Sequence, residues 1–204
     1  MLKGILRTDL FFCNHLGVRE EDEKDIMNFT IRNTRGMGLL NYIQKVAFAD
    51  EDNGVMRTYI VRDIRTSELV GYFSLKTGLI SLNERTIEVN DKNSGISIQK
   101  TLFDTLPGVE LANFAINDTY IRRHPDMKGV GFVIFESFIL PIIRKTSEHV
   151  GLKILYLFSL PYDELIERYK QYGFSRLENP YEDELHRRLK PQYDQSCKFM
   201  YQIL

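Results

Sequence analysis

The segment Asp126-Met127-Lys128-Gly129-Val130-Gly131 places two glycines between an apolar run and a long helical pattern. The apolar run, Val109 to Ile116, has the length and composition of a strand, and the helical pattern begins at Phe132. Bare backbone N–H groups at the start of a helix, with the positive end of the helix dipole, favour a phosphate oxyanion. The segment is therefore predicted to hold a pyrophosphate, although two glycines in a loop more often form a plain turn.

The segments that follow this loop add to the prediction. Lys153 to Phe158 is an apolar run of strand length, and Leu160 to Asp163 opens a second, shorter helix. That helix carries Tyr169 and ends at Tyr172-Gly173-Phe174. The order strand, Gly-x-Gly loop, long helix, strand, short helix and Tyr-x-x-x-Gly-Phe resembles the GNAT family of acyl-CoA-dependent N-acetyltransferases, over about residues 55 to 178.

The resemblance implies a fold and an activity. The fold would be α/β (α+β), with a mixed, mostly antiparallel sheet flanked by helices, in a single domain over residues 1–204. Residues 83–108 are polar and mixed and read as an insertion before the central strand. The activity would be transfer of an acetyl group from acetyl-CoA, the co-substrate, to an amine by direct attack in a ternary complex.

The resemblance also assigns the cofactor-binding residues. In the family the Gly-x-Gly loop cradles the CoA pyrophosphate, and backbone N–H groups at a bulge in the central strand bind the thioester carbonyl. The loop residues here are Asp126, Met127, Lys128, Gly129, Val130 and Gly131, and the carbonyl donors would be Phe114, Ala115 and Ile116.

Two residues are candidates for the proton transfers that acyl transfer requires. Tyr169 occupies the position where the family often has its general acid, and the alternative is an aromatic side chain that packs the short helix. Glu110 would share one face of the strand with Ala112, Phe114 and Ile116 by period two, where the histone-acetyltransferase branch has a general base. The alternative for Glu110 is a solvated carboxylate at the strand end.

A basic cluster lies just before and within the loop. Arg122, Arg123, His124 and Lys128 are predicted to meet the CoA phosphates, including the 3′-phosphate, through charge-assisted contacts. The alternative is a set of solvated surface charges. A rival phosphate loop, Arg35-Gly36-Met37-Gly38, has no strand before it and is expected to be a joint between helices that face the acceptor cleft.

Departures from the family pattern leave the function open. Asp126 stands where the family prefers Gln or Arg, and Tyr162 stands where it often has Asn, so a non-catalytic CoA-binding or sensing module is an alternative. Another alternative is a GNAT-type toxin that acetylates aminoacyl-tRNA, because Leu10 to Cys13 followed by a helix, and then Val70 to Leu75, loosely resemble the front half of those toxins. A net charge of −1 argues against nucleic acid in general, without excluding tRNA. The acceptor is otherwise expected to be a small-molecule or peptide amine.

Composition is that of an ordinary globular protein, with 43% hydrophobic and 27% charged residues. Cys13 and Cys197 lie far apart and no Cys/His cluster occurs, so buried free thiols and no metal site are expected. Without a signal peptide or membrane span, we expect a cytoplasmic protein, and a homodimer is compatible with this assignment. The acidic run Glu20 to Glu23 is expected to be a solvated helix face.

Overall fold

A single eight-stranded sheet, in the order β1-β2-β3-β4-β5-β6-β8-β7, organises the fold. The computed structural model describes residues 6–90, 97–189 and 196–204, with side chains outside 81–104. In these ranges β5 and β6 pair in parallel and all other neighbours pair antiparallel, which confirms the predicted fold class. The strands are β1 (Leu6–Arg7), β2 (Phe11–His15), β3 (Arg57–Asp63), β4 (Leu69–Asn90), β5 (Ser97–Ile116), β6 (Ile154–Ser159), β7 (Ser175–Arg176) and β8 (Lys198–Ile203).

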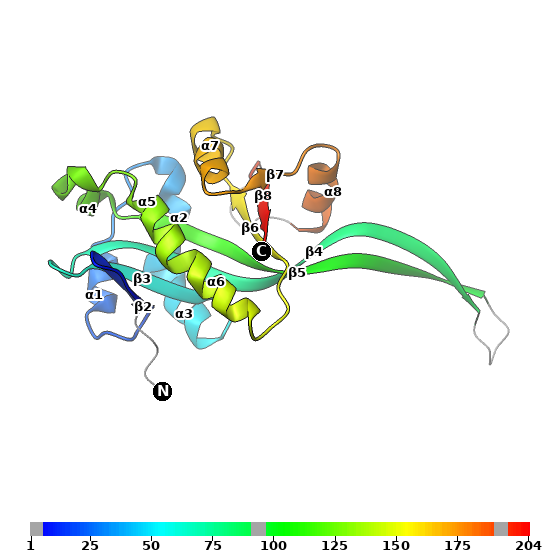
Figure 1. The fold of residues 1–204 in the computed structure, drawn as a ribbon, viewed down its shortest axis with the longest axis horizontal. Coiled ribbons are helices and arrows are strands. Elements are labelled where there is room, and N and C mark those ends of the chain that lie inside the picture. The colour runs from blue at the N-terminus through cyan, green and yellow to red at the C-terminus, as the bar shows by residue number, and fades with distance from the viewer. Residues whose placement is uncertain (1–5, 91–96, 190–195) are drawn as a thin grey trace.

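Helices cover both faces of the sheet (Figure 1). One face carries α5 (Val130–Ile134), the π-helical turn Phe135–Ile139 and α6 (Leu140–Ser147), which follow one another without a break. The other face carries α1 (Asp22–Met27), the 3-10 turn Thr34–Gly36, α2 (Met37–Asn41), a π-helical turn Tyr42–Val46 and α3 (Ala47–Asp52). The remaining helices are α4 (Asp118–Arg123), the 3-10 turn Pro125–Met127, α7 (Asp163–Gln171) and α8 (Tyr181–Arg188).

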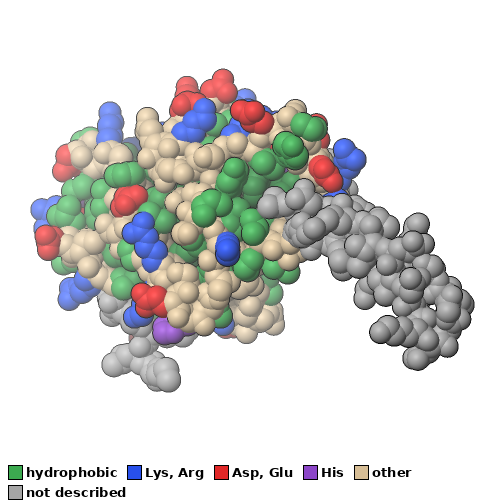
Figure 2. Space-filling model, turned by 45° about the vertical axis from the view of Figure 1, so that its right-hand side comes forward, with side chains coloured by type: hydrophobic (Ala, Val, Ile, Leu, Met, Phe, Trp, Pro, Cys, Tyr) green, Lys and Arg blue, Asp and Glu red, His purple; other side chains and the backbone are tan. Residues whose placement is uncertain are grey.

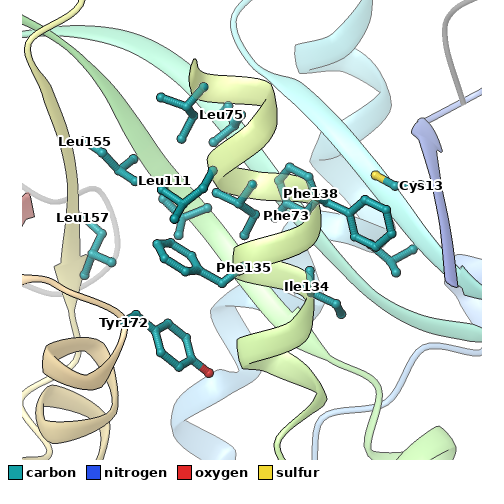
Figure 3. Packing of buried hydrophobic residues seen from close by; sticks show 14 of the residues in the cluster. Cys13, Phe73, Leu75, Leu111, Ile134, Phe135, Phe138, Leu155, Leu157 and Tyr172 are labelled. Atoms are coloured by element: carbon teal, nitrogen blue, oxygen red, sulfur yellow. The ribbon is translucent and has the colours of Figure 1, made fainter. Parts of the chain in front are cut away.

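Each helical layer encloses its own hydrophobic core. Under the α5–α6 helix, Phe73 of β4 packs with Phe135 and Phe138, which are all fully buried (Figure 3). Under α1–α3, Ile43 and Tyr72 belong to a second buried cluster. Each such apolar side chain stabilises the fold by roughly 1.5–3 kcal/mol on burial, so both helical layers are fixed firmly to the sheet between them.

The strands β4 and β5 form a hairpin that projects well beyond the body of the protein (Figure 1). Their register is antiparallel from Gly71↔Ile116 outward to Asn90↔Ser97. Residues 83–108, expected as an insertion, make up the outer part of this hairpin, except for 91–96, which lie outside the described residues. The central strand therefore begins at Ser97 and not at Val109.

The acidic run Glu20 to Glu23 is not entirely a solvated face, so that prediction is wrong for one residue. Asp22 is fully buried, and its carboxylate accepts a hydrogen bond from the Nη2 of Arg62 at 2.8 Å. Arg62 lies on β3 and is itself only 1% exposed. A buried guanidinium needs a counter-charge, and Asp22 and Asp25 supply it, so α1 is held to the sheet by an ion cluster.

The cysteines behave as the sequence predicts, since Cys13 and Cys197 are both buried and neither forms a disulfide. In the part of the chain that the structure describes, no helix has the length and apolar character needed to cross a membrane.

Candidate active site

The strands β5 and β6 diverge at the centre of the sheet. Their parallel pairing covers only Gly108↔Ile154 to Glu110↔Tyr156. Beyond that point β5 stays paired with β4 as far as Ile116, while β6 stays paired with β8 as far as Ser159. The two strands therefore leave a wedge between them, with Leu111 on one side and Leu157 on the other (Figure 3).

A cleft of about 520 Å³ occupies this wedge and extends toward α2. Both strands line it, as do the α2 layer and α7, and the predicted residues Phe114, Glu110 and Tyr169 are all at its wall. Of the other predicted carbonyl donors, Ala115 is buried beneath the α1–α3 layer and Ile116 packs against the α5–α6 core. The fold thus brings Tyr169 of α7 to the same cleft as Glu110 and Phe114, two residues of β5.

A β-bulge in β5 lies at the wall of this cleft. Leu111 pairs with Leu75 and Asn113 pairs with Ser74, so Ala112 is an extra residue without a partner on β4. The predicted position of the bulge, at Phe114 to Ile116, is wrong, because those residues pair regularly with β4. The bulge reverses the alternation of side chains along the strand after it.

This reversal changes which residues share a face with Glu110. Phe114 and Ile116 pack on the α5–α6 side, as does Leu111 before the bulge. Alternation places Glu110 opposite to Leu111, so the predicted common face of Glu110 with Phe114 and Ile116 is wrong. Ala112 does share the face of Glu110, on the α1–α3 side.

The backbone of Phe114 presents a hydrogen-bond donor to the wedge. The N–H of Asn117 donates to the carbonyl of Val70 at 2.8 Å, toward β4. Because such bonds alternate along an antiparallel strand, Ala115 and Asn113 point the same way and the N–H of Phe114 points away from β4. This geometry supports Phe114 as the donor to a carbonyl oxygen in the cleft.

Tyr169 is held on α7 by aromatic contacts. Its ring meets the rings of Tyr172 and Phe174 edge-on, with centroids 5.9 Å and 5.7 Å away. Burial raises the pKa of Tyr169 above the ordinary tyrosine value, so the phenol keeps its proton at neutral pH. A neutral phenol at the cleft wall can donate a proton, so the packing role and the acid role are compatible.

Glu110 is not the solvated carboxylate of the alternative interpretation. It is 8% exposed, and its Oε2 lies 3.2 Å from the Nζ of Lys76, its partner across the strand pair. Burial, followed by the charge of Glu110 and a hydrogen bond to it, raises the pKa of Tyr156. Glu110 therefore lies in a buried polar group at the point where β5 and β6 part, and Lys76 also lines the cleft.

The predicted phosphate loop has the expected backbone form. It passes through the 3-10 turn Pro125–Met127 and reaches α5 through Gly129, whose φ of 88° is in the left-handed region. At Gly131 a side chain would meet the hydroxyl of Tyr172 at 3.1 Å and the ring of Phe114 at 3.7 Å. The start of α5 is therefore bare backbone directly beside a cleft residue, as a phosphate cradle requires.

The four side chains of the basic cluster differ in their partners. The Nη1 of Arg123 lies 2.7 Å from one oxygen of Glu68, and the Nε2 of His124 lies 2.6 Å from the other. Arg122 donates to Thr119 at 2.9 Å, and Lys128 is exposed. Arg123 and His124 thus attach the segment before the loop to Glu68 in the β3–β4 turn. Lys128 and Arg122 are therefore the better candidates for contacts with phosphate.

The rival glycine segment is part of the cleft rim. The side chain of Asn33 accepts from the N–H of Arg35 and caps the 3-10 turn, so this segment has its own cap. The guanidinium of Arg35 lies 4.1 Å from the centre of the Tyr162 ring. Arg35 and Gly38 line the cleft, which fits a joint facing the acceptor side.

Comparison with known proteins shows the fold alone. No protein-family model matches the chain, and no curated protein sequence does. Among solved structures, a tyrosine-to-phenylalanine mutant of KacT has a TM-score of 0.63 at 16% identity, covering 96% of this chain and 95% of that one. AtaTR bound with acetyl-CoA has a TM-score of 0.62 at 17% identity, with the same coverage. AtaT complexed with acetyl-methionyl-tRNAfMet has a TM-score of 0.57 at 16% identity and covers 93% of both chains.

Proposed function

We propose that the protein is an acetyl-CoA-dependent N-acetyltransferase whose acceptor is the amino group of an aminoacyl-tRNA. The observation that carries the proposal is that Phe114, Tyr169 and the glycine-bearing start of α5 all border one wedge between β5 and β6. A carbonyl donor, a proton donor and a phosphate cradle are the three groups that acetyl transfer from a CoA thioester needs.

The residues present fit the pyrophosphate of acetyl-CoA. At Gly129 a side chain would meet open space and at Gly131 it would fill the gap beside Tyr172 and Phe114, so the backbone there is accessible to phosphate oxygens. When bound, acetyl-CoA supplies the activated acetyl group. Val130 and Gly131 would offer N–H groups to its phosphates, and the wedge past Glu110 would admit its pantetheine arm.

The chain's own groups then divide the chemistry. The N–H of Phe114 stabilises negative charge on the carbonyl oxygen as the amine attacks. Tyr169 gives its proton to the departing sulfur, and Glu110 is the candidate acceptor of the amine proton. Direct attack requires amine and thioester to occupy the cleft together, and a cleft of about 520 Å³ that reaches from α7 to the α2 layer supports such a ternary complex.

The choice of aminoacyl-tRNA rests on a structural neighbour, AtaT complexed with acetyl-methionyl-tRNAfMet. The net charge of −1 provides no general attraction for a polyanion, so contacts to RNA must be local. Arg35 at the cleft rim and the exposed Lys45 on the adjacent π-helical turn supply such local charge. This acceptor also implies a cytoplasmic site of action.

The test is thiol release from acetyl-CoA in the presence of aminoacyl-tRNA, peptide and small amine panels. We expect release with aminoacyl-tRNA and little with uncharged tRNA, which lacks the amine. Thiol release only with peptides or small amines would show that the acceptor is one of these and not aminoacyl-tRNA. If acetyl-CoA binds but no panel gives release, the protein is a non-catalytic CoA-binding module.

A further inference from the structure

The bulge at Ala112 brings Asn113 onto the same side of the sheet as Glu110. In a regular strand, residues 110 and 113 would face opposite sides, but the extra residue shifts the alternation by one position. Asn113 accordingly contacts Met56 of the α1–α3 cluster and lines the cleft together with Glu110. The strand thus directs a side-chain amide toward the acceptor side of the wedge.

The orientation of this amide is fixed by the sulfur of Met56. The Nδ2 of Asn113 donates to the Sδ of Met56 at 3.8 Å, and the hydroxyl of Tyr42 donates to the same sulfur at 3.5 Å. A thioether can only accept, so the NH₂ end of the amide faces Met56 and the carbonyl end is turned away from it. Asn113 is only 7% exposed, and its Oδ1 has no protein partner among the residues that the structure describes.

Buried hydroxyl groups on β3 and β4 form a hydrogen-bonded row next to Tyr42. Thr58, Ser74 and Asn113 are register neighbours on β3, β4 and β5. The hydroxyls of Thr58 and Ser74 are 3.0 Å apart, and the hydroxyl of Tyr42 is 3.2 Å from that of Thr58. These groups satisfy one another, whereas the amide oxygen of Asn113 accepts no hydrogen bond from the part of the chain that the structure describes.

We propose that Asn113 positions the acceptor, with its Oδ1 accepting a hydrogen bond from an N–H of the acceptor's amino group. The inference rests on the proposed function, because it assumes that this part of the cleft receives the acceptor. Phe114, the next residue, offers its N–H to the carbonyl that the amine attacks. Adjacent residues of one strand would therefore hold nucleophile and electrophile side by side, and the site selects amines that retain a free N–H.

The test measures binding of two probes to the CoA-loaded protein by calorimetry: methioninamide, which mimics an aminoacyl ester, and 4-(methylsulfanyl)butanamide, the same molecule without the amino group. We expect the wild type to prefer the free amine by roughly tenfold, the scale of one hydrogen bond from a charged donor. Asn113→Leu should abolish the preference, and Asn113→Asp, which keeps an acceptor oxygen, should retain or increase it. CoA affinity should not change.

Two further variants separate positioning from a structural effect. Met56→Leu removes the sulfur that orients the amide, so the preference should fall although Asn113 is intact. Asn41→Leu is the matched control, since Asn41 also lines the cleft, and it should keep the wild-type preference. No preference in the wild type, or a preference that survives Asn113→Leu, overturns the inference, and so does equal loss in Asn41→Leu. Amine selectivity without transfer to aminoacyl-tRNA would instead refute the proposed function alone.

Discussion

The hydroxyl of Tyr172 lies 3.1 Å from the point where a Cβ on Gly131 would stand. Tyr172 is buried at the end of α7 and stacks on Phe135, with ring centroids 5.1 Å apart. Gly131 belongs to the first turn of α5. The small size of residue 131 therefore lets the C-terminal end of α7 approach the start of α5 closely, beside the proposed phosphate cradle (Figure 3).

Replacing Gly131 by alanine should weaken acetyl-CoA binding because the new methyl group pushes on the hydroxyl of Tyr172. We expect a loss of about tenfold, and a larger loss for Gly131→Val. Tyr172→Phe removes the hydroxyl, so the double variant Gly131→Ala/Tyr172→Phe should recover most of the affinity. Calorimetric titration with acetyl-CoA checks this. An unchanged affinity of Gly131→Val for acetyl-CoA would mean that the loop does not bind the pyrophosphate.

Tyr169→Phe should reduce turnover by roughly 10²-fold or more, the usual scale for a lost general acid. The ring contacts with Tyr172 and Phe174 remain, so the melting temperature and the affinity for acetyl-CoA should stay near wild type. Thiol-release kinetics with the acceptor identified by the panels give the measurement. Lower stability at normal turnover would mean that Tyr169 only packs the helix.

The order of elements around the wedge could be predicted from the sequence because each depends on local patterns. The apolar runs, the glycines before Phe132 and the Tyr-x-x-x-Gly-Phe ending are all contiguous. Strand β6 and helix α7 lie where those patterns place them, and α5 begins at Val130, two residues before the expected helical pattern. The glycine of φ 88° is one of the two in the quoted segment. Such local patterns predict the elements correctly because they determine the backbone conformation of their own residues directly.

The face that each residue presents could not be predicted. Period two assigns Glu110, Phe114 and Ile116 to one side, but the bulge at Ala112 separates them. No residue in the segment marks a bulge, because bulges depend on how two strands register across the sheet. Asn113 was missed for this reason. The buried pair of Asp22 and Arg62 was missed because the sequence shows charge and not the distant partner that neutralises it.

Lys76 and Glu110 should behave as a coupled pair. Their 3.2 Å contact is largely shielded from solvent, so Lys76→Met leaves a buried carboxylate without its partner and should destabilise the fold by about 1–2 kcal/mol. The double variant Lys76→Met/Glu110→Gln should be more stable than the sum of the single changes predicts. Urea denaturation of the four proteins checks this. Additive free energies would mean that the ion pair contributes nothing.

Acid should loosen the approach to the phosphate loop through Glu68. Hydrogen bonds from His124 and then Arg123 lower the pKa of Glu68 below the ordinary glutamate value. A lowered folded-state pKa means that its stabilisation is complete above the unfolded value of about 4.3 and is lost as the pH falls through the folded value. The melting temperature of Glu68→Gln should therefore approach that of wild type as the pH falls below about 4.3. The exposed Glu148→Gln should follow wild type throughout.

Lys128 should contribute more to CoA affinity than Arg123 does. Arg123 is already paired with Glu68 at 2.7 Å, whereas Lys128 is exposed two residues before α5 and can turn toward a phosphate. We expect Lys128→Ala to weaken CoA binding about threefold to tenfold in low salt, with the difference from wild type shrinking as salt rises. Arg123→Ala should lower stability slightly and leave affinity nearly unchanged. Binding of dephospho-CoA, which lacks the 3′-phosphate, then shows which phosphate Lys128 contacts. If Lys128→Ala reduces the wild-type preference for CoA over dephospho-CoA, the lysine contacts the 3′-phosphate. If Lys128→Ala lowers the affinity for both ligands equally, the lysine contacts the pyrophosphate. Equal CoA affinity of wild type and Lys128→Ala at every salt concentration would mean that Lys128 is a solvated surface charge without a phosphate contact.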